Sequence, residues 1–375
     1  MRISKLLFPT CLMFAMLALI APNMQALQNT GGPDEPVKIG LLIPDNKSIA
    51  ARYGAEMAIR KANEKGGFND RPFQLVVRSM EGPWGTGSKE AVSLIFDEEV
   101  WAIMGSHDGR NAHLVEQVAT KARIVFLSAW TSDPTLSQAF IPWYFSCVPN
   151  DLQQADALIE EIYNKRKFYK VASVSDNSYD SKLAIKSFVK KTKTAGKTDP
   201  LQFFYDNSSQ YFDDLLDQIS KSNVNCIILF GQPSALLKLI QQMRQRKMNQ
   251  PVFGTLSVLD EKELSDQELK IFENVVLISS EHWFKSSGLV FQEEFRKLYG
   301  YRPGSVAAYA YDGMNLVIEA IRRAGLDRDN IQKSMAKLHY DGVTGVIQFD
   351  DKGNRLGAAG LIEIKNGIPV AVGRD

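Results

Sequence analysis

The sequence predicts an α/β protein with two doubly wound, Rossmann-like lobes joined by a multi-strand hinge. Short apolar runs alternate along the chain with longer amphipathic runs, which is typical of a parallel sheet with crossover helices on both faces. This alternating series occurs twice, before and after about residue 148. The length of 375 residues also favours two domains over one.

The first series predicts one complete lobe by about residue 140. The segment 48–65 reads as a helix because small and apolar residues recur at helical spacing, and Gly66 with Gly67 ends it. The other intervening segments also read as helices. The strands that we expect are 37–43, 73–79, 101–104 and 124–128.

The second series predicts a second sheet, joined to the first near residues 148–150. Too many residues lie between the first strand and the run at 251–254 for one sheet of ordinary size. The expected strands are 169–174, 201–205, 224–230 and 251–254, and the expected helices are 151–165, 181–194, 212–221 and 234–246.

The tail adds elements to both lobes. We expect a strand at 274–279, helices at 289–299 and 305–324, and strands at 345–349 and 358–372, with Asn366 and Gly367 as a hairpin turn. A tail that returns to both lobes crosses between them several times and makes a hinge. Ligands of such folds bind in the cleft at the carboxyl ends of the strands. The predicted division is 37–148 plus 281–341 for the N-terminal lobe and 149–280 plus 342–375 for the C-terminal lobe.

The N-terminus has the pattern of a signal peptide. Arg2 and Lys5 precede an apolar run at 6–21, which is shorter than the roughly 20 residues that span a bilayer. We expect a signal peptide at 1–26 and a flexible leader at 27–36. Cys11 lacks the small-residue context of a lipoprotein signal, so we expect no lipid anchor and a periplasmic protein.

The charge balance excludes whole classes of partner. The 44 Lys and Arg residues nearly cancel the 43 Asp and Glu residues, and the formal net charge is +1. Such a chain has no global field to attract nucleic acid or an anionic membrane. We therefore expect no nucleic-acid partner and recognition of any ligand by local sites.

No motif predicts an enzyme, a metal or a cofactor. The string at 87–89 reads Gly-Ser-Lys, not the Gly-Lys-Ser/Thr of a phosphate-binding loop, and the adjacent Ser106, His107 and Asp108 lack the spacing of a catalytic triad. Cys147 and Cys226 lie in apolar runs and read as two buried thiols. The four histidines have no metal-ligand spacing: His107, His113, His282 and His339.

Several strings, in their order and spacing, resemble the type I periplasmic solute-binding proteins of ABC transporters, most closely the Leu/Ile/Val-binding branch. The similarity extends from residue 37 to about 372. Its carriers are V-K-I-G-L-L-I-P at 37–44, Y-G-A-E-M-A-I-R-K-A-N-E-K-G-G-F at 53–68, W-A-I-M-G-S at 101–106, L-S-A-W-T-S-D-P-T-L at 127–136 and Y-A-Y-D-G-M-N-L-V at 309–317.

The resemblance implies a binding site with contributions from both lobes. In this family two loops of the first lobe, each followed by a helix N-terminus, hold the ligand's carboxylate. The second lobe adds an aromatic residue and a further contact, and one tyrosine covers the side chain of the ligand. On this chain, the first loop corresponds to Gly109 and Arg110, and the second loop corresponds to Trp130, Thr131 and Ser132. The contacts from the second lobe fall on Tyr179 and Gln232, and the covering tyrosine is Tyr53.

One departure from the family bears on the ligand. Amino-acid binders of this branch place an acidic residue after the strand at 251–254, whereas this chain has Thr255, Leu256 and Ser257. An unpaired buried ammonium is costly, and the guanidinium of Arg110 in the anion loop would suit a carboxylate. We therefore expect an anionic small molecule with a flat or branched apolar part that Trp130 could stack on, with an amino acid as the family default.

The resemblance implies a monomeric solute-binding protein that closes its two lobes around an amino acid or organic acid and delivers it to an ABC transporter permease in the inner membrane. Two alternatives stay open at this point. One is a ligand-sensing receptor domain, and the other, with less support, is a periplasmic enzyme.

Overall fold

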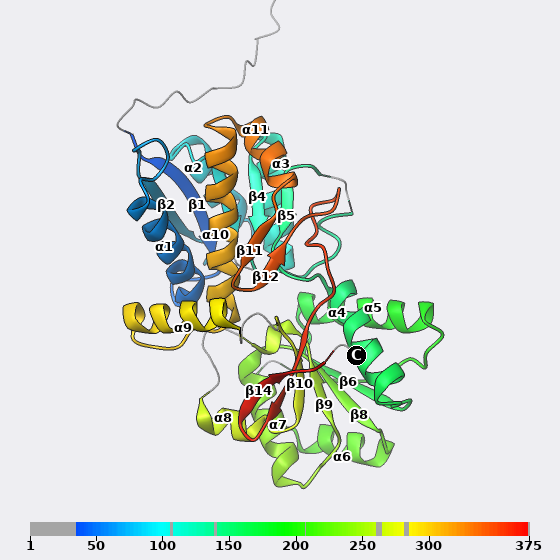
Figure 1. The fold of residues 1–375 in the computed structure, drawn as a ribbon. Coiled ribbons are helices and arrows are strands. Elements are labelled where there is room, and N and C mark those ends of the chain that lie inside the picture. The colour runs from blue at the N-terminus through cyan, green and yellow to red at the C-terminus, as the bar shows by residue number, and fades with distance from the viewer. Residues whose placement is uncertain are drawn as a thin grey trace, which may run out of the picture. The chain divides into compact units, whose positions relative to one another are not determined.

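The computed structural model of the chain describes residues 35–105, 108–138, 141–206, 208–259, 265–280 and 285–373. Two separate sheets, each with helices packed against it, form two lobes (Figure 1). This arrangement confirms the predicted fold class. The expected signal peptide and nearly all of the leader lie outside the described residues.

The first sheet is entirely parallel and has the order β2-β1-β3-β4-β5. Almost every side chain of β1, β3, β4 and β5 is buried, as expected for a sheet covered on both faces. Its strands are β1 (Val37–Ile43), β2 (Phe73–Ser79), β3 (Ala102–Gly105), β4 (Val125–Ser128) and β5 (Tyr144–Ser146).

Helices from the start and the end of the chain cover the first sheet. Helices α1 and α10 pack closely, because Gly54 lets the backbone of α1 approach the carbonyl oxygen of Ala307. The helices of this lobe are α1 (Ile49–Glu64), α2 (Thr86–Phe96), α3 (Gly109–Lys121), α9 (Ser286–Tyr299), α10 (Ser305–Ala324) and α11 (Arg328–Ala336).

The second sheet is mixed and has the order β14-β13-β10-β9-β8-β6-β7. Its β6–β10 portion is parallel, and the tail adds β13 and β14 as an antiparallel hairpin. Asn366 and Gly367 both have positive φ in the hairpin turn, as predicted. The strands are β6 (Val171–Ser175), β7 (Leu201–Phe204), β8 (Cys226–Phe230), β9 (Val252–Gly254), β10 (Val275–Ile278), β13 (Leu361–Lys365) and β14 (Ile368–Ala371).

The helices of the second lobe begin close to the expected residues. The predicted helix 151–165 is divided, because its last six residues have π-helical hydrogen bonding. The helices are α4 (Asp151–Ile159), the π-helical η1 (Glu160–Lys165), α5 (Tyr179–Thr194), α6 (Asp213–Ser222), α7 (Pro233–Gln245), the 3₁₀ turn η2 (Leu256–Val258) and α8 (Asp266–Ile271).

Three connections join the lobes, after β5, after β10 and after the small hairpin of β11 (Tyr340–Gly342) and β12 (Gly345–Ile347). The third connection keeps contact with the first lobe, because Asp312 of α10 accepts hydrogen bonds from the backbone of Val343 and Thr344. The chain then enters the second sheet at β13. The lobe boundaries near 148, 280 and 341 stay a prediction.

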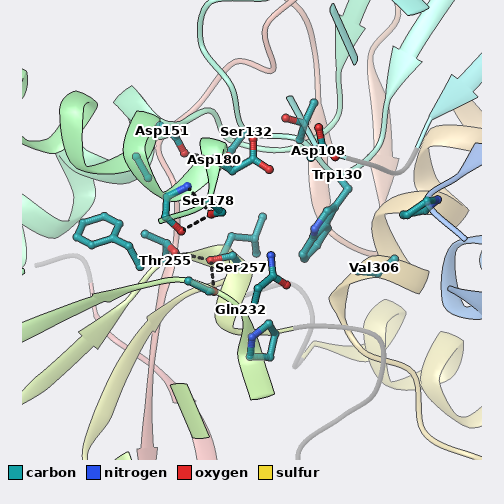
Figure 2. A pocket seen from close by; sticks show the side chains of 18 of the residues that line it. Asp108, Trp130, Ser132, Asp151, Ser178, Asp180, Gln232, Thr255, Ser257 and Val306 are labelled. Atoms are coloured by element: carbon teal, nitrogen blue, oxygen red, sulfur yellow. Dashed lines mark hydrogen bonds between the residues drawn. The ribbon is translucent and has the colours of Figure 1, made fainter. Parts of the chain in front are cut away.

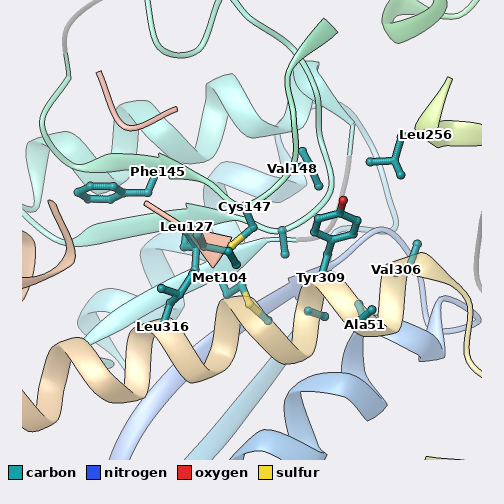
Figure 3. Packing of buried hydrophobic residues seen from close by; sticks show 14 of the residues in the cluster. Ala51, Met104, Leu127, Phe145, Cys147, Val148, Leu256, Val306, Tyr309 and Leu316 are labelled. Atoms are coloured by element: carbon teal, nitrogen blue, oxygen red, sulfur yellow. The ribbon is translucent and has the colours of Figure 1, made fainter. Parts of the chain in front are cut away.

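The core against α10 is apolar and contains one of the two cysteines of the described residues (Figure 3). Met104, Leu127 and Cys147 pack against the buried face of α10, which carries Tyr309 and Leu316. Both Cys147 and Cys226 are buried and free, which confirms the sequence-based expectation. Within the described ranges, no helix combines the length and the apolar character that crossing a bilayer requires.

Candidate functional site

A cavity of about 360 Å³ lies between the two lobes, where strands of both sheets end and helices begin. The first lobe contributes the loop after β1, the cap of α3, residues 130–132 after β4 and the start of α10. The second lobe contributes the first turns of α4 and α5, the β8–α7 junction and residues 255–257 after β9 (Figure 2). We call it the interlobe cavity. It is the cleft that the fold class predicts at the carboxyl ends of the strands.

Four aspartates line the interlobe cavity, and its described lining residues include no Lys, Arg or His. Asp45 follows β1, and its Oδ1 accepts the backbone N–H groups of Lys47 and Ser48. Asp108 is the N-cap of α3, with Oδ1 bound to the backbone N–H of Asn111. These two carboxylates hold helix starts and still face the cavity, which is therefore acidic.

Asp151 is the most buried of the four aspartates. The Ser132 hydroxyl donates to its Oδ1 at 2.7 Å, and its own backbone N–H donates to the Ser132 carbonyl at 2.8 Å. Burial raises the pKa of the Asp151 carboxyl well above its ordinary value, and the charges of Asp180 and Asp133 add to the effect. The shift favours the protonated form of Asp151, and a protonated carboxyl can donate as well as accept a hydrogen bond.

Asp180 of the second lobe forms a hydrogen bond with the first lobe. It lies in the first turn of α5, and its Oδ1 accepts the backbone N–H of Gly109 at the start of α3, at 3.0 Å. Burial raises its pKa to about 6, and the charges of Asp108 and Asp133 act in the same direction. The carboxyl is therefore mostly ionised at pH 7.5, at the positive end of two helices.

One wall of the interlobe cavity is apolar. Trp130, Leu256 and Val306 contribute it, and Trp130 packs edge-on against Tyr309 with ring centroids 6.3 Å apart. Figure 2 shows Trp130 and Val306 on the side opposite Asp151. The cavity thus offers both carboxyl groups and an apolar surface, which suits a solute with a cationic group and a hydrophobic body.

Buried hydrogen bonds fix the second-lobe part of the lining. Asp176, fully buried, accepts the backbone N–H of Gln232 and so sets the β8–α7 junction. Gln154 accepts the backbone N–H of Leu256 at 2.9 Å. The hydroxyls of Thr255 and Ser257 lie 2.8 Å apart. These contacts preorganise the wall before any solute binds.

Four of the predicted site residues line the interlobe cavity. Trp130, Thr131 and Ser132 reach it from the first lobe, and Gln232 reaches it from the second. Their direct contact with a solute stays a prediction.

The other four predicted site residues do not line the cavity. The Gly109 N–H is bound to Asp180, and the Arg110 guanidinium lies over the rings of Trp84 and Tyr179, 5.8 Å from each centroid. Arg110 is the second residue of α3 and is exposed. The geometry therefore does not support the use of Arg110 to hold a solute carboxylate.

Tyr179 and Tyr53 are occupied elsewhere. Tyr179 is the first residue of α5, because Ser178 caps this helix, and its hydroxyl donates to Asp133 at 3.3 Å. Tyr53 stacks on Tyr299 with ring centroids 4.1 Å apart. Tyr179 thus takes part in a contact between the lobes, and Tyr53 packs α1 against α9.

The contact of Tyr179 belongs to a polar cluster beside the cavity. The buried Asp133 carboxylate also binds Nε2 of His113 at 3.1 Å and the Thr135 hydroxyl at 2.6 Å. Hydrogen bonds to Asp133 and to Glu116 raise the pKa of His113 to about 9. His113 therefore carries a proton at neutral pH and pairs with Asp133. The described residues contain no grouping of His, Cys, Asp and Glu suited to hold a metal ion.

Sequence reasoning missed the acidic lining. Asp108, Asp151 and Asp180 share one signal, since each stands at the cap or in the first turn of a helix that follows a strand of a doubly wound sheet. Acids at such positions are read first as helix caps. Only the meeting of the two lobes gathers them around one cavity.

Comparison with known proteins agrees with this architecture. The sequence model of the family described as "Periplasmic binding protein" matches residues 36–362. Among solved structures, the branched-chain amino acid transporter substrate-binding protein LivJ of Streptococcus pneumoniae, in complex with isoleucine, has a TM-score of 0.78 and 20% identity, covering 90% of this chain and 99% of that one.

Two further structures have the same fold and contain different ligands. A substrate-binding protein from Desulfitobacterium hafniense in complex with Leu has a TM-score of 0.73 and 22% identity, over 90% of this chain and 100% of that one. A solute-binding protein from R. palustris in complex with benzoate has a TM-score of 0.77 and 18% identity, over 90% of this chain and 96% of that one. At these identities the likeness establishes the fold and leaves the ligand open.

A curated relative comes from a plant. Glutamate receptor 3.7 of Arabidopsis thaliana is 25% identical over 219 residues, which is 56% of this chain. The chain spans 23% of that receptor's own length.

Proposed function

Because this chain belongs to the periplasmic binding protein family, a family of binding proteins rather than enzymes, we propose that it captures an amine-bearing solute of the amino-acid class and delivers it to an ABC importer. In this proposal the protein acts as a monomer in the periplasm, and its partner is the transporter's permease in the inner membrane. The organic-acid ligand of the sequence-based prediction becomes the competing outcome.

The acidic lining of the interlobe cavity carries the proposal. Four aspartates and no described basic side chain face the space between the lobes. An ammonium group in such a cavity gains charge-assisted hydrogen bonds, whereas a simple organic anion meets like charges in a partly desolvated space. Asp180 lies in the second lobe, is mostly ionised at pH 7.5 and compensates for the missing acid after β9.

The mechanism is closure of the two lobes around the solute. The apolar wall of Trp130 and Val306 belongs to the first lobe, and Asp180 and Gln232 belong to the second. A solute that binds both sets of groups stabilises the closed arrangement relative to the open one. Contacts between the lobes, such as the one from Asp180 to Gly109, favour the same arrangement.

A panel of solutes tests the solute class. Stripped protein is titrated at pH 7.5 with neutral, branched and basic amino acids and with organic acids of matched size, and melting temperature and binding heat are recorded. We expect saturable binding by at least one amine-bearing solute. Tight binding by organic acids, with no binding by any amine, would refute the amine-based site.

Two matched variants test the location of the site. Ser132→Ala removes the hydroxyl that holds Asp151, and we expect about tenfold weaker solute binding. Asp214→Asn is the control, because this exposed aspartate of α6 does not line the cavity. Normal binding in Ser132→Ala, or an equal loss of binding in both variants, would place the solute elsewhere.

A sensing role is the second candidate, and the match to a plant glutamate receptor favours it. Deletion of the gene in the source cell separates the two roles. A transport protein predicts loss of uptake of the radiolabelled solute, whereas a sensor predicts normal uptake with loss of a response to the solute.

A further inference from the structure

A second cavity, of about 320 Å³, lies at the connections between the lobes. Its lining draws on all three of them: Pro149 on the first, Ser279 and Ser280 on the second, and residues 355–360 on the third. Residues of the β11–β12 hairpin and Tyr309 of α10 complete it. We call it the hinge cavity. Tyr309 packs against Trp130, so this aromatic pair separates the hinge cavity from the interlobe cavity.

The hinge cavity is opposite in charge to the interlobe cavity. Among the described residues that line the hinge cavity, Arg355 carries a charge, and none of these residues is an aspartate or a glutamate. Arg355 is 9% exposed, and its Nη1 and Nη2 atoms donate to the carbonyl oxygens of Cys147, Thr344 and Val346 and to the Thr344 hydroxyl. No carboxylate of the described residues forms an ion pair with it.

The nearest compensating acid lies on the far side of Thr344. The Thr344 hydroxyl donates to Asp312 at 2.6 Å and accepts from Arg355 at 3.1 Å. Asp312 is fully buried and does not line the cavity. The guanidinium also lies over the Tyr309 ring, 5.8 Å from its centroid, and no acid of the described residues lines the cavity beside it. A buried charge is stabilised when an opposite charge approaches it.

Two nearly buried hydroxyls in the cavity lining lack hydrogen-bond partners. Tyr309 is 3% exposed and Ser279 is 4% exposed, and within the described ranges neither hydroxyl forms a hydrogen bond. Figure 3 shows the Tyr309 hydroxyl pointing away from α10. Both residues line the cavity, so their hydroxyls are available to donate to a molecule bound in it.

We propose that the hinge cavity is a second binding site, which takes a small organic carboxylate. The carboxylate would accept hydrogen bonds from the Tyr309 and Ser279 hydroxyls, in the field of Arg355. Its apolar part would lie against Val346 and Leu356, which are 43% and 48% exposed at the rim. This rim favours a carboxylate with a short hydrocarbon chain over an inorganic anion. The proposal does not rest on the amine-binding role of the interlobe cavity.

Sodium butyrate is the probe for the test. The purified full chain is titrated by calorimetry at pH 7.5, at an ionic strength held constant with sodium chloride, and sodium sulfate is titrated in parallel. We expect saturable binding of butyrate alone. Equal heats from sulfate, or no saturable butyrate signal, would overturn the proposal.

Conservative variants locate the probe. Tyr309→Phe and Ser279→Ala each remove one hydroxyl and keep the packing and Arg355, and each should weaken butyrate binding about tenfold. Tyr163→Phe is the matched control, because it removes a buried tyrosine hydroxyl that binds the Thr198 carbonyl in the second lobe. Circular dichroism checks that each variant is folded.

Two more variants keep the result decisive. Ala358→Phe narrows the cavity at an exposed rim position and should abolish butyrate binding with Arg355 intact. Ser132→Ala alters the interlobe cavity and should leave butyrate binding unchanged. Butyrate binding that is insensitive to Tyr309→Phe, Ser279→Ala and Ala358→Phe, or that is lost in Ser132→Ala, would overturn the proposal.

Discussion

Replacement of Asp180 by asparagine should stabilise the protein and weaken its binding of an amine. In the wild-type chain burial raises the pKa of this carboxyl from an ordinary value of 3.8 to about 6, with the charges of Asp108 and Asp133 contributing. The folded protein therefore holds an anion in a place that disfavours it. An asparagine keeps an oxygen that can accept the Gly109 N–H and removes the charge.

The difference between the two pKa values sets the size of the change in the free energy of unfolding. A rise from 3.8 to about 6 corresponds to at most about 3 kcal/mol of destabilisation at pH 7.5. As the pH falls through about 6, the folded state takes up a proton before the unfolded chain does, so this cost shrinks to about 1 kcal/mol at pH 4.5. Asp180→Asn should therefore raise the melting temperature by about 2 to 6 °C at pH 7.5 and by much less at pH 4.5.

Differential scanning calorimetry at both pH values, with titration of the amine-bearing solute at pH 7.5, measures both effects. Asp214→Asn is the control, because this exposed aspartate of α6 lies outside the interlobe cavity. We expect solute affinity to fall at least about tenfold in Asp180→Asn alone. A variant that is less stable than wild type at pH 7.5, or that binds the amine with unchanged affinity, would refute the reasoning.

Three further predictions concern stability. His113→Gln should lower the melting temperature at pH 6, and the difference from wild type should vanish as the pH rises through about 9. The reason is that the pKa of His113 is raised from 6.5 to about 9 in the folded protein, so its stabilising effect is complete below 6.5 and is lost above about 9. A difference that does not depend on pH would contradict this. Gly54→Ala should cost about 1 to 3 kcal/mol in urea unfolding, because its Cβ would lie 2.2 Å from the Ala307 carbonyl oxygen; an unchanged unfolding midpoint would contradict it. The two buried thiols of the described chain should react with a thiol reagent only in denaturant, and rapid labelling of the native protein would contradict their burial.

Most of the fold could be predicted because burial leaves a direct record in the sequence. The central strands of both sheets are buried runs of mostly apolar residues, and the observed β1 and β2 have the predicted bounds. Short elements with little periodicity were harder to predict from the sequence. The three-residue β5 (Tyr144–Ser146) was not predicted, and the π-helical end of the helix at 151–165 has no pattern that distinguishes it from an α-helix.

The candidate site could be predicted only in part. The resemblance indicated Trp130, Ser132 and Gln232, all of which line the cavity. Arg110 was selected for its charge, but residue type does not reveal the direction of a side chain, and this one lies over two aromatic rings. Asp180 escaped notice because its role depends on a contact between segments that are 71 residues apart.

Native mass spectrometry of the protein, purified without added solute and without refolding, tests the central claim most directly. The acidic interlobe cavity predicts a copurified small molecule that carries an amine and is absent from the Asp180→Asn protein. A copurified molecule without an amine, retained by Asp180→Asn and lost at high concentrations of a simple organic acid, would contradict an amine-binding site.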